Sequence, residues 1–311
     1  MRIIYNRPRN SELVLTIGSF DGIHLGHRQI MKKTMQEADR YDCDSALFTF
    51  TPHPLEVVAP AAAPQVLTSY HQKVDLIKKF GINRIIFKRF TKEFAVMPYQ
   101  EFIKKYLVER FAVRKIIVGQ DFRCGYQSQG TPAKIKELGA KYGFEVETIP
   151  AIEIDNQDIS STYIRKLITE GAVGKVRRQL GRNFKLESKV IAGDGRGRKL
   201  GYPTANLKPV TNYVIPPAGV YACRIKINDE LYNGVVNLGY RPTFNKNDFS
   251  IEVYIFDFSD MIYEQTVELE FVERIREELD FSTKEELIKK KKKDVQEAKE
   301  ILMDTTAVLR V

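Results

Sequence analysis

The sequence predicts two domains: a doubly wound α/β domain built on a parallel sheet, then a smaller antiparallel β-barrel with a C-terminal helix. Up to about residue 180, short apolar strand patterns alternate with helical patterns, which is typical of a parallel sheet. Beyond that point, strand patterns follow one another without helices between them, which is typical of a barrel. The 311 residues suffice for two cores. We place the domains at 1–183 and 184–311.

The first half of the chain carries the alternation of strands and helices. Its predicted strands are 13–17, 45–50, 84–87, 115–118 and 144–149. Its predicted helices are one that follows a glycine-bearing turn near residue 26, and then 69–80, 99–111 and 132–142. One more helix is predicted after 160–162, where two serines and a threonine precede an apolar pattern and suit an N-cap.

The second half carries short strands with alternating patterns. They are predicted at 185–191, 219–227, 231–238, 250–256 and 266–274, with a further strand-like segment near Thr204. A closing helix is predicted over 284–303, with its inward face formed by Leu287, Val295, Ala298, Ile301 and Leu302.

The charge balance is basic, with 49 lysines and arginines against 40 acidic residues and a formal net charge of +9. Five of these charges come from the run of lysines at 289–293, which we interpret as a solvated helix face. The remaining excess suits a protein whose substrates are triphosphates. Because no RNA-binding signature with interleaved aromatic residues is present, we expect no nucleic-acid partner.

No segment indicates a membrane or an export route. No apolar run approaches the roughly 20 residues that a spanning helix needs. The first eight residues lack the apolar core of a signal peptide. The three cysteines, Cys43, Cys124 and Cys223, are scattered and odd in number, which favours free thiols in a reducing compartment. We therefore expect a cytoplasmic protein with no membrane partner, and the oligomeric state stays open.

The most informative stretch lies at 17–31, between the first predicted strand and the helix that follows it. Three glycines there allow backbone to approach a ligand, and the free N–H groups of a helix N-terminus attract phosphate. His24 and His27 add two imidazoles to the same turn, where they can stabilise charge that builds on phosphorus. This His-x-Gly-His pattern resembles the signature of the nucleotidyltransferase superfamily, which implies attack on the α-phosphate of a nucleoside triphosphate.

Three later segments offer further polar groups. His53 stands between two prolines after the second predicted strand, and we expect it near the first two histidines. Asp121 lies in a long polar loop, 119–131, that suits a lid over the substrate. Ser161 and Thr162, with Arg165 one turn further on, suit a second anion site at a helix N-terminus.

In this order, these segments resemble the bacterial FAD synthetase module, a Rossmann-like nucleotidyltransferase domain. The resemblance implies that His24 and His27 contact the phosphates of ATP, with Ser161, Thr162 and Arg165 as their partners. It also implies that Asp121 lies in the loop that holds nucleotide and flavin. We predict catalytic roles for His24, His27 and Arg165. The positions predicted to bind substrate are Gly18, Phe20, Asp21, His53, Asp121, Ser161 and Thr162.

In the second half, a loop rich in glycine and arginine leads into Thr204 and Asn206. A threonine hydroxyl and an asparagine carbonyl are hard oxygen ligands that suit Mg²⁺. Glu252 lies in an alternating strand between Ile251 and Val253. A barrel-facing carboxylate there can accept a hydroxyl proton, whereas an outward one would be solvated.

These features resemble the riboflavin kinase module. The resemblance rests on Gly-Tyr-Pro-Thr-Ala-Asn at 201–206, Gly-Val-Tyr at 219–221, Arg-Pro-Thr-Phe at 241–244 and the glutamate strand. It implies that Thr204 and Asn206 contact Mg²⁺ and the ATP phosphates, and that Glu252 is the general base toward the ribityl hydroxyl. Gly201 and Arg241 are also predicted to bind substrate. Two positions depart from the family pattern: Tyr254 replaces a common histidine, and Glu264 replaces a usual glycine.

Together, the two resemblances predict a bifunctional enzyme with riboflavin, FMN and ATP as substrates and Mg²⁺ as cofactor. Its barrel would phosphorylate riboflavin to FMN, and its α/β domain would adenylylate FMN to FAD with release of pyrophosphate. One alternative is a cytidylyltransferase acting on a phosphorylated alcohol, against which the barrel argues. Another is a basic RNA-associated protein with inactive catalytic modules.

Overall fold

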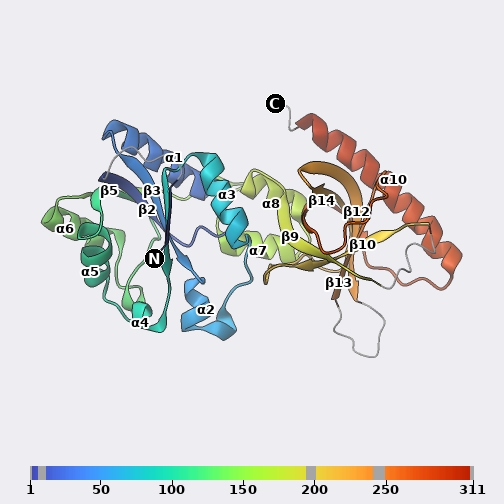
Figure 1. The fold of residues 1–311 in the computed structure, drawn as a ribbon, viewed down its shortest axis with the longest axis horizontal. Helices are drawn as coiled ribbons and strands as arrows, with labels where there is room; N and C mark the ends of the chain where they lie inside the picture. The colour runs from blue at the N-terminus through green and yellow to red at the C-terminus, as the bar shows by residue number, and fades with distance from the viewer. Residues whose placement is uncertain (1, 6–11, 194–200, 241–248, 309–311) are drawn as a thin grey trace. The chain divides into compact units, whose positions relative to one another are not determined.

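The computed structural model describes residues 2–5, 12–193, 201–240 and 249–308. The chain forms two compact units (Figure 1). One contains the residues up to 65 together with 70–160, and the other contains 66–69 together with everything from residue 161 onward. The second unit therefore includes two helices that precede the barrel in sequence. The domain boundary at 183/184 stays a prediction.

The first unit is built on a six-stranded sheet with the order β1-β4-β3-β2-β5-β6. The strands are β1 (Arg2–Tyr5), β2 (Glu12–Ile17), β3 (Asp44–Thr51), β4 (Arg84–Arg89), β5 (Ala112–Gly119) and β6 (Glu145–Ile149). All pairs among β2 to β6 are parallel, which confirms the predicted sheet. The sequence did not predict β1, a four-residue edge strand that runs antiparallel to β4.

Helices cover both faces of this sheet. On one face, α1 (Leu25–Arg40) and α3 (Tyr70–Phe80) bury Met31, Val74 and Ile77. On the other face lie α5 (Tyr99–Phe102), η2 (Ile103–Val108) and α6 (Pro132–Tyr142). The helix predicted over 99–111 is thus a short α-helix that widens into a π-helical segment and ends at Val108.

Shorter elements complete the first unit. They are α2 (Pro54–Val58), η1 (Pro60–Ala62), α4 (Lys92–Ala95), η3 (Tyr126–Ser128), β7 (Glu153–Ile154) and β8 (Gln157–Asp158). The loop over 119–131 is closed on itself, because Cys124 and Gly130 exchange two backbone hydrogen bonds of 2.8 and 3.0 Å. Its Tyr126 amide also donates to the Met97 carbonyl at 2.8 Å.

The second unit begins with α7 (Ser161–Thr169) and α8 (Val173–Leu180), and α8 was not predicted. Helix α8 packs against two barrel strands, β9 (Phe184–Ile191) and β14 (Thr266–Glu277), and buries Val173, Val176 and Leu180. The approach is close, because a Cβ at Gly174 would lie 2.3 Å from Oε2 of Glu273.

The barrel is closed, with the order β10-β13-β12-β11-β14-β9, and every neighbouring pair is antiparallel. Its remaining strands are β10 (Thr204–Pro209), β11 (Gly219–Ile227), β12 (Glu230–Tyr240) and β13 (Phe249–Ile255). The C-terminal helix α10 (Lys284–Val308) packs on the outside of the barrel through Ala298 and Leu302 (Figure 1). This architecture confirms the predicted fold class.

The structure also bears on the expectations about the cysteines and about membrane-spanning helices. The three cysteines are free thiols, as predicted, and burial raises the pKa of Cys124 to about 12. Within the described residues, no helix has both the length and the apolar character needed to cross a membrane.

Candidate active sites

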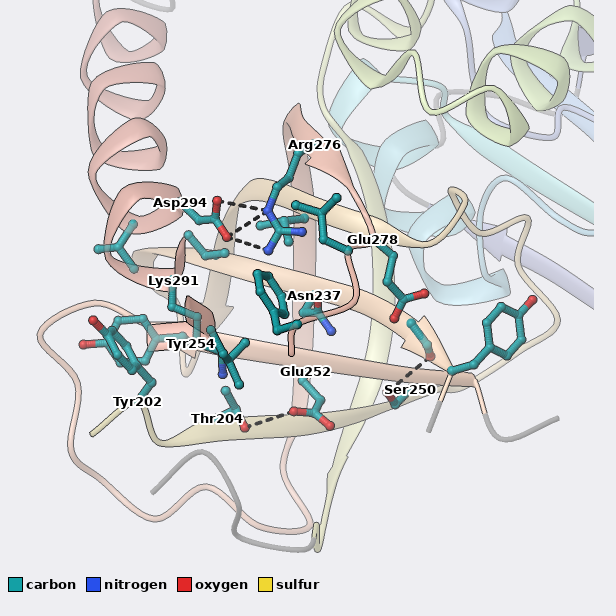
Figure 2. Close-up of a pocket in the computed structure, with 18 of the residues that line it drawn as sticks. Tyr202, Thr204, Asn237, Ser250, Glu252, Tyr254, Arg276, Glu278, Lys291 and Asp294 are labelled. Atoms are coloured by element: carbon teal, nitrogen blue, oxygen red, sulfur yellow. Dashed lines mark hydrogen bonds and ion pairs between the residues drawn. The ribbon is translucent and has the colours of Figure 1, made fainter. Parts of the chain in front are cut away.

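One candidate site is a cavity of about 340 Å³ in the second unit, between the outer face of the barrel and α10. The antiparallel register of three adjacent strands builds its floor in two rows. One row consists of Asn206, Glu252 and Asn237, which are direct cross-strand neighbours. The next row consists of Thr204, Tyr254 and Val235. The helix supplies the roof, with Leu287, Lys291, Asp294 and Val295 (Figure 2).

The sequence analysis set a barrel-facing Glu252 that can act as a base against an outward one that is solvated, and the structure fits neither alternative. Ile251 and Val253 are buried, and the intervening Glu252 points to the opposite face. That face is the outer one, because Tyr254, two residues on, packs in the cluster formed with Ala298 and its neighbours on α10. An outward carboxylate was expected to be merely solvated, and this expectation is wrong, since α10 covers the face and makes it a pocket.

Thr204 and Asn206, which the sequence analysis names as metal-binding and phosphate-binding candidates, both line this cavity. The Thr204 hydroxyl donates to Glu252 at 3.5 Å, and Asn206 is 8% exposed. The backbone at Gly193 lies close against the amide of Asn206, because a Cβ there would be 2.0 Å from Nδ2. A hydroxyl, an amide carbonyl and a carboxylate at one place form an oxygen donor set that fits a hard divalent cation.

The other charged groups around the cavity differ in whether they form ion pairs. Asp294 accepts three hydrogen bonds from the Arg276 guanidinium, at 2.7 to 3.1 Å (Figure 2). Burial lowers the pKa of Lys291, while attraction from Glu252 and Asp294 acts in the opposite direction. Burial, with a smaller contribution from Tyr254, raises the pKa of Tyr202.

The sequence analysis did not name every residue of this site, and some residues that it did name do not line the cavity. Asn237 lies within β12, inside the strand predicted at 231–238, but it was not named as a site residue, although its register puts it opposite Glu252. Gly201 precedes β10 with a φ of +80° and is not among the residues that line the cavity. Arg241 lies outside the described residues. Glu264, where the family usually has glycine, has a φ of +66°, a conformation that favours glycine.

The second candidate site lies at the carboxyl ends of β2, β3 and β5 in the first unit. The strand order changes direction at β2, because β3 follows on one side and β5 on the other. Such switch points are where open α/β sheets hold ligands. The loops that carry Asp21, His53 and Asp121 follow these three strands.

The turn after β2 presents its two histidines as a pair. Their rings stack with centroids 3.6 Å apart, and Nδ1 of His24 accepts a hydrogen bond from the His27 amide at the start of α1. The His24 side chain therefore caps the helix. Phe20 lies 5.0 Å from the His27 ring, and a Cβ at Gly26 would lie 3.2 Å from the His24 ring. The turn joins imidazole groups to a helix N-terminus, an arrangement suited to phosphate.

Neighbouring groups hold this turn in place. The Gly18 amide donates to the Phe48 carbonyl at 3.1 Å, and the carbonyl of Ser19 accepts from Thr49 and from the ammonium of Lys73. Asp21 is buried. Lys73, on α3, places a cation beside the turn, and no sequence pattern indicated this lysine. These contacts fix the backbone that follows β2.

His53 and Asp121 also lie in ordered local structure. His53 caps α2, where its Nδ1 accepts from the Leu55 amide at 3.3 Å. A Cβ at Gly119 would lie 2.9 Å from Oδ1 of Asp121, so the carboxylate lies against the end of β5. The expected proximity of His53 to the histidine pair stays a prediction.

Ser161, Thr162 and Arg165 belong to the first two turns of α7. The helix starts at Ser161, so Ser161 and Thr162 lie inside its first turn instead of preceding it. Because α7 belongs to the second compact unit, the partnership of these residues with His24 and His27 stays a prediction.

Comparisons with known proteins assign a family to each half of the chain. A family model described as FAD synthetase matches residues 6–163, and one described as riboflavin kinase matches 180–302. A bifunctional riboflavin kinase/FMN adenylyltransferase of Haemophilus influenzae is 36% identical over 92% of each chain. The protein of the same description from Bacillus subtilis is 34% identical, over 94% of this chain and 93% of its own.

One solved structure is similar over almost the whole chain. It is a crystal structure described as a macrolide-efflux protein from Streptococcus pneumoniae, with a TM-score of 0.84 and 27% identity over 94% of this chain and 95% of its own. Its similarity supports the fold. Since both family models match in order and relatives above 30% identity span most of the chain, the protein belongs to the bifunctional riboflavin kinase/FMN adenylyltransferase family.

Proposed function

We propose that the chain converts riboflavin to FAD in two ATP-dependent steps. At the barrel, the γ-phosphoryl group of ATP passes to riboflavin, giving FMN and ADP. In the α/β unit, a second ATP gives its AMP moiety to FMN, and FAD and pyrophosphate are formed. The observation that carries the proposal is the carboxylate of Glu252 between two asparagine side chains on the floor of a covered pocket.

In the kinase step, Glu252 accepts the proton of the ribityl hydroxyl while the hydroxyl oxygen forms a bond to the γ-phosphorus of ATP. The bond from that phosphorus to the ADP oxygen breaks at the same time. A positioned base of this kind contributes roughly 10²–10⁴ in rate. Thr204 and Asn206 are the residues that would hold a divalent cation, which we propose is Mg²⁺. When bound, the cation supplies positive charge to the phosphate oxygens.

In the adenylyl step, a phosphate oxygen of FMN attacks the α-phosphorus of ATP, and the bond to pyrophosphate breaks. His24 and His27 donate hydrogen bonds to the oxygens on which charge builds, beside the amides at the start of α1. We assign Ser161, Thr162 and Arg165 to the same phosphates, with Gly18, Phe20, Asp21, His53 and Asp121 around the nucleotide and flavin. Gly201 and Arg241 are assigned to substrate binding at the barrel.

The direct experiment is incubation of the purified chain with riboflavin, ATP and MgCl₂, followed by chromatography for FMN and FAD. A parallel reaction that starts from FMN tests the second step by itself. Omitting the metal, or replacing Mg²⁺ with Mn²⁺, tests the choice of cation. An RNA-associated protein with inactive modules would instead leave ATP intact and retain RNA in a salt-dependent way.

A further inference from the structure

The lysine run at 289–293 does not form one solvated face. Lys289, Lys292 and Lys293 are exposed, whereas Lys290 and Lys291 are partly buried. Lys290 forms an ion pair with Asp294 at 3.2 Å. Lys291 lines the cavity from its α10 side (Figure 2). The helical repeat explains the division, because Lys291 lies four residues after Leu287 and three before Asp294, which both line the cavity.

Lys291 differs from the other cation of the cavity in its pairing. The guanidinium of Arg276 is occupied by Asp294. In the part of the chain that the structure describes, no carboxylate lies within ion-pair distance of the Lys291 ammonium, and the ring of Tyr202 lies 5.9 Å away. Glu252 and Asp294 are near enough to attract the charge without pairing with it. Partial burial of an ammonium costs free energy that an anionic ligand would offset.

The position of Glu252 indicates which anion binds beside Lys291. If Glu252 takes the proton of the ribityl hydroxyl, the phosphorus that this oxygen attacks must lie beside Glu252. Glu252 is on the floor and Lys291 extends from the roof of the same cavity. A lysine on a four-carbon stem is a point charge that suits phosphate oxygens.

We propose that Lys291 binds the phosphoryl group that passes from ATP to the flavin. It contacts the γ-phosphate oxygens of ATP before transfer and the 5′-phosphate oxygens of FMN afterwards. The ammonium keeps its proton throughout, since the hydroxyl proton goes to Glu252 and the leaving group is ADP. This inference rests on the proposed kinase function of the barrel.

The test compares Lys291→Met with Lys292→Met in the full-length chain. Both changes remove one positive charge and keep an unbranched stem, but Lys292 is exposed on α10. Binding of riboflavin and of FMN is measured separately by flavin fluorescence in the absence of ATP, and FMN formation is measured by chromatography. His27→Ala is present in every variant, so that the FMN formed in the chromatography assay is consumed at most slowly by the adenylyl step.

For Lys291→Met we expect FMN to bind about 10- to 100-fold more weakly, the range for one lost charge-assisted hydrogen bond, with riboflavin affinity unchanged. The kinase kcat should fall by about the same factor. Lys292→Met should leave all three quantities unchanged, and Lys291→Arg should recover most of the FMN affinity. If Lys291→Met misfolds, Lys291→Arg and Lys291→Gln provide the same comparison.

Equal weakening of riboflavin and FMN would overturn the proposal, because Lys291 would then contact the ring or the ribityl chain. Unchanged FMN affinity and kcat would overturn it as well. Failure of the kinase function itself is distinguishable, since the parent chain would then neither bind riboflavin nor form FMN.

Discussion

Asn206 of β10 and Glu252 of β13 lie directly opposite each other in the barrel sheet, and Asn237 of β12 lies opposite Glu252 on its other side. The carboxylate is thus held between two amide side chains by strand register alone. A slip of β13 by one residue would turn Glu252 to the barrel interior and away from both asparagines. The geometry on which the kinase proposal rests is therefore a property of the whole barrel.

Glu252→Gln tests the proposed base. Glutamine keeps the shape and one hydrogen-bonding oxygen but loses the basicity, so FMN formation should slow by roughly 10²–10⁴. Riboflavin binding and FMN adenylylation should be kept. The matched control is Asp257→Asn, because Asp257 is exposed just beyond β13 and asparagine tolerates its φ of +53°. Parent-like phosphorylation by the Glu252 variant would show that the base lies elsewhere.

His27→Ala tests the adenylyl site. Loss of one donor to the developing charge should slow FAD formation by about 10²–10³ and leave FMN formation nearly unchanged. The control is His71→Ala, an exposed histidine on α3. Separate assays that start from riboflavin and from FMN measure the two steps. Equal loss of both activities would indicate misfolding, and full activity would remove His27 from the mechanism.

The environment of Glu37 predicts that the first unit becomes less stable in acid. Hydrogen bonds from Lys33 and Lys115, at 2.8 and 2.9 Å, lower the pKa of this buried carboxyl from 4.5 to about 2. Because the folded-state pKa lies below the ordinary value, this contribution to stability is complete above pH 4.5 and disappears as the pH falls toward 2. Unfolding by urea across this pH range measures the effect.

Glu37→Gln should lower the free energy of unfolding near neutral pH by about 1–3 kcal/mol, less than for a fully orphaned buried charge, since Lys115 also pairs with Glu147 at 2.6 Å. The variant should also lose part of the pH dependence between 4.5 and 2. Glu101→Gln, at an exposed position, should change neither quantity. An unchanged pH profile for Glu37→Gln would contradict the prediction.

Separate fragments test how the activities divide. A fragment from residue 161 to Val311 should make FMN and no FAD. A fragment that starts at 184 lacks α8, whose buried Val173, Val176 and Leu180 pack against β9 and β14. Since each buried apolar side chain contributes about 1.5–3 kcal/mol, the shorter fragment should unfold at a clearly lower temperature. A well-folded but inactive longer fragment would show that the kinase site needs residues from the first unit.

Local patterns determined much of this protein in advance. The sequence predicted 219–227 and 132–142 with the bounds that β11 and α6 have, because alternation and helical spacing are properties of neighbouring residues. The two motif series likewise predicted the family, which the comparisons confirm. The resemblance to the riboflavin kinase module implied roles for Thr204, Asn206 and Glu252, and the structure brings these three side chains to one cavity.

Which faces of the elements are covered depends on long-range contacts that local sequence patterns do not contain. Strand alternation puts Glu252 and Tyr254 on one side, but whether that side is solvated depends on where α10 docks, some thirty residues further along the chain. The same docking separates Lys291, which lines the pocket, from its exposed neighbour Lys292. The pairing of β1 and the packing of α8 on the barrel are also long-range contacts. Periodicity assigns residues to a face, whereas the partner of that face is set by free energy summed over the folded chain.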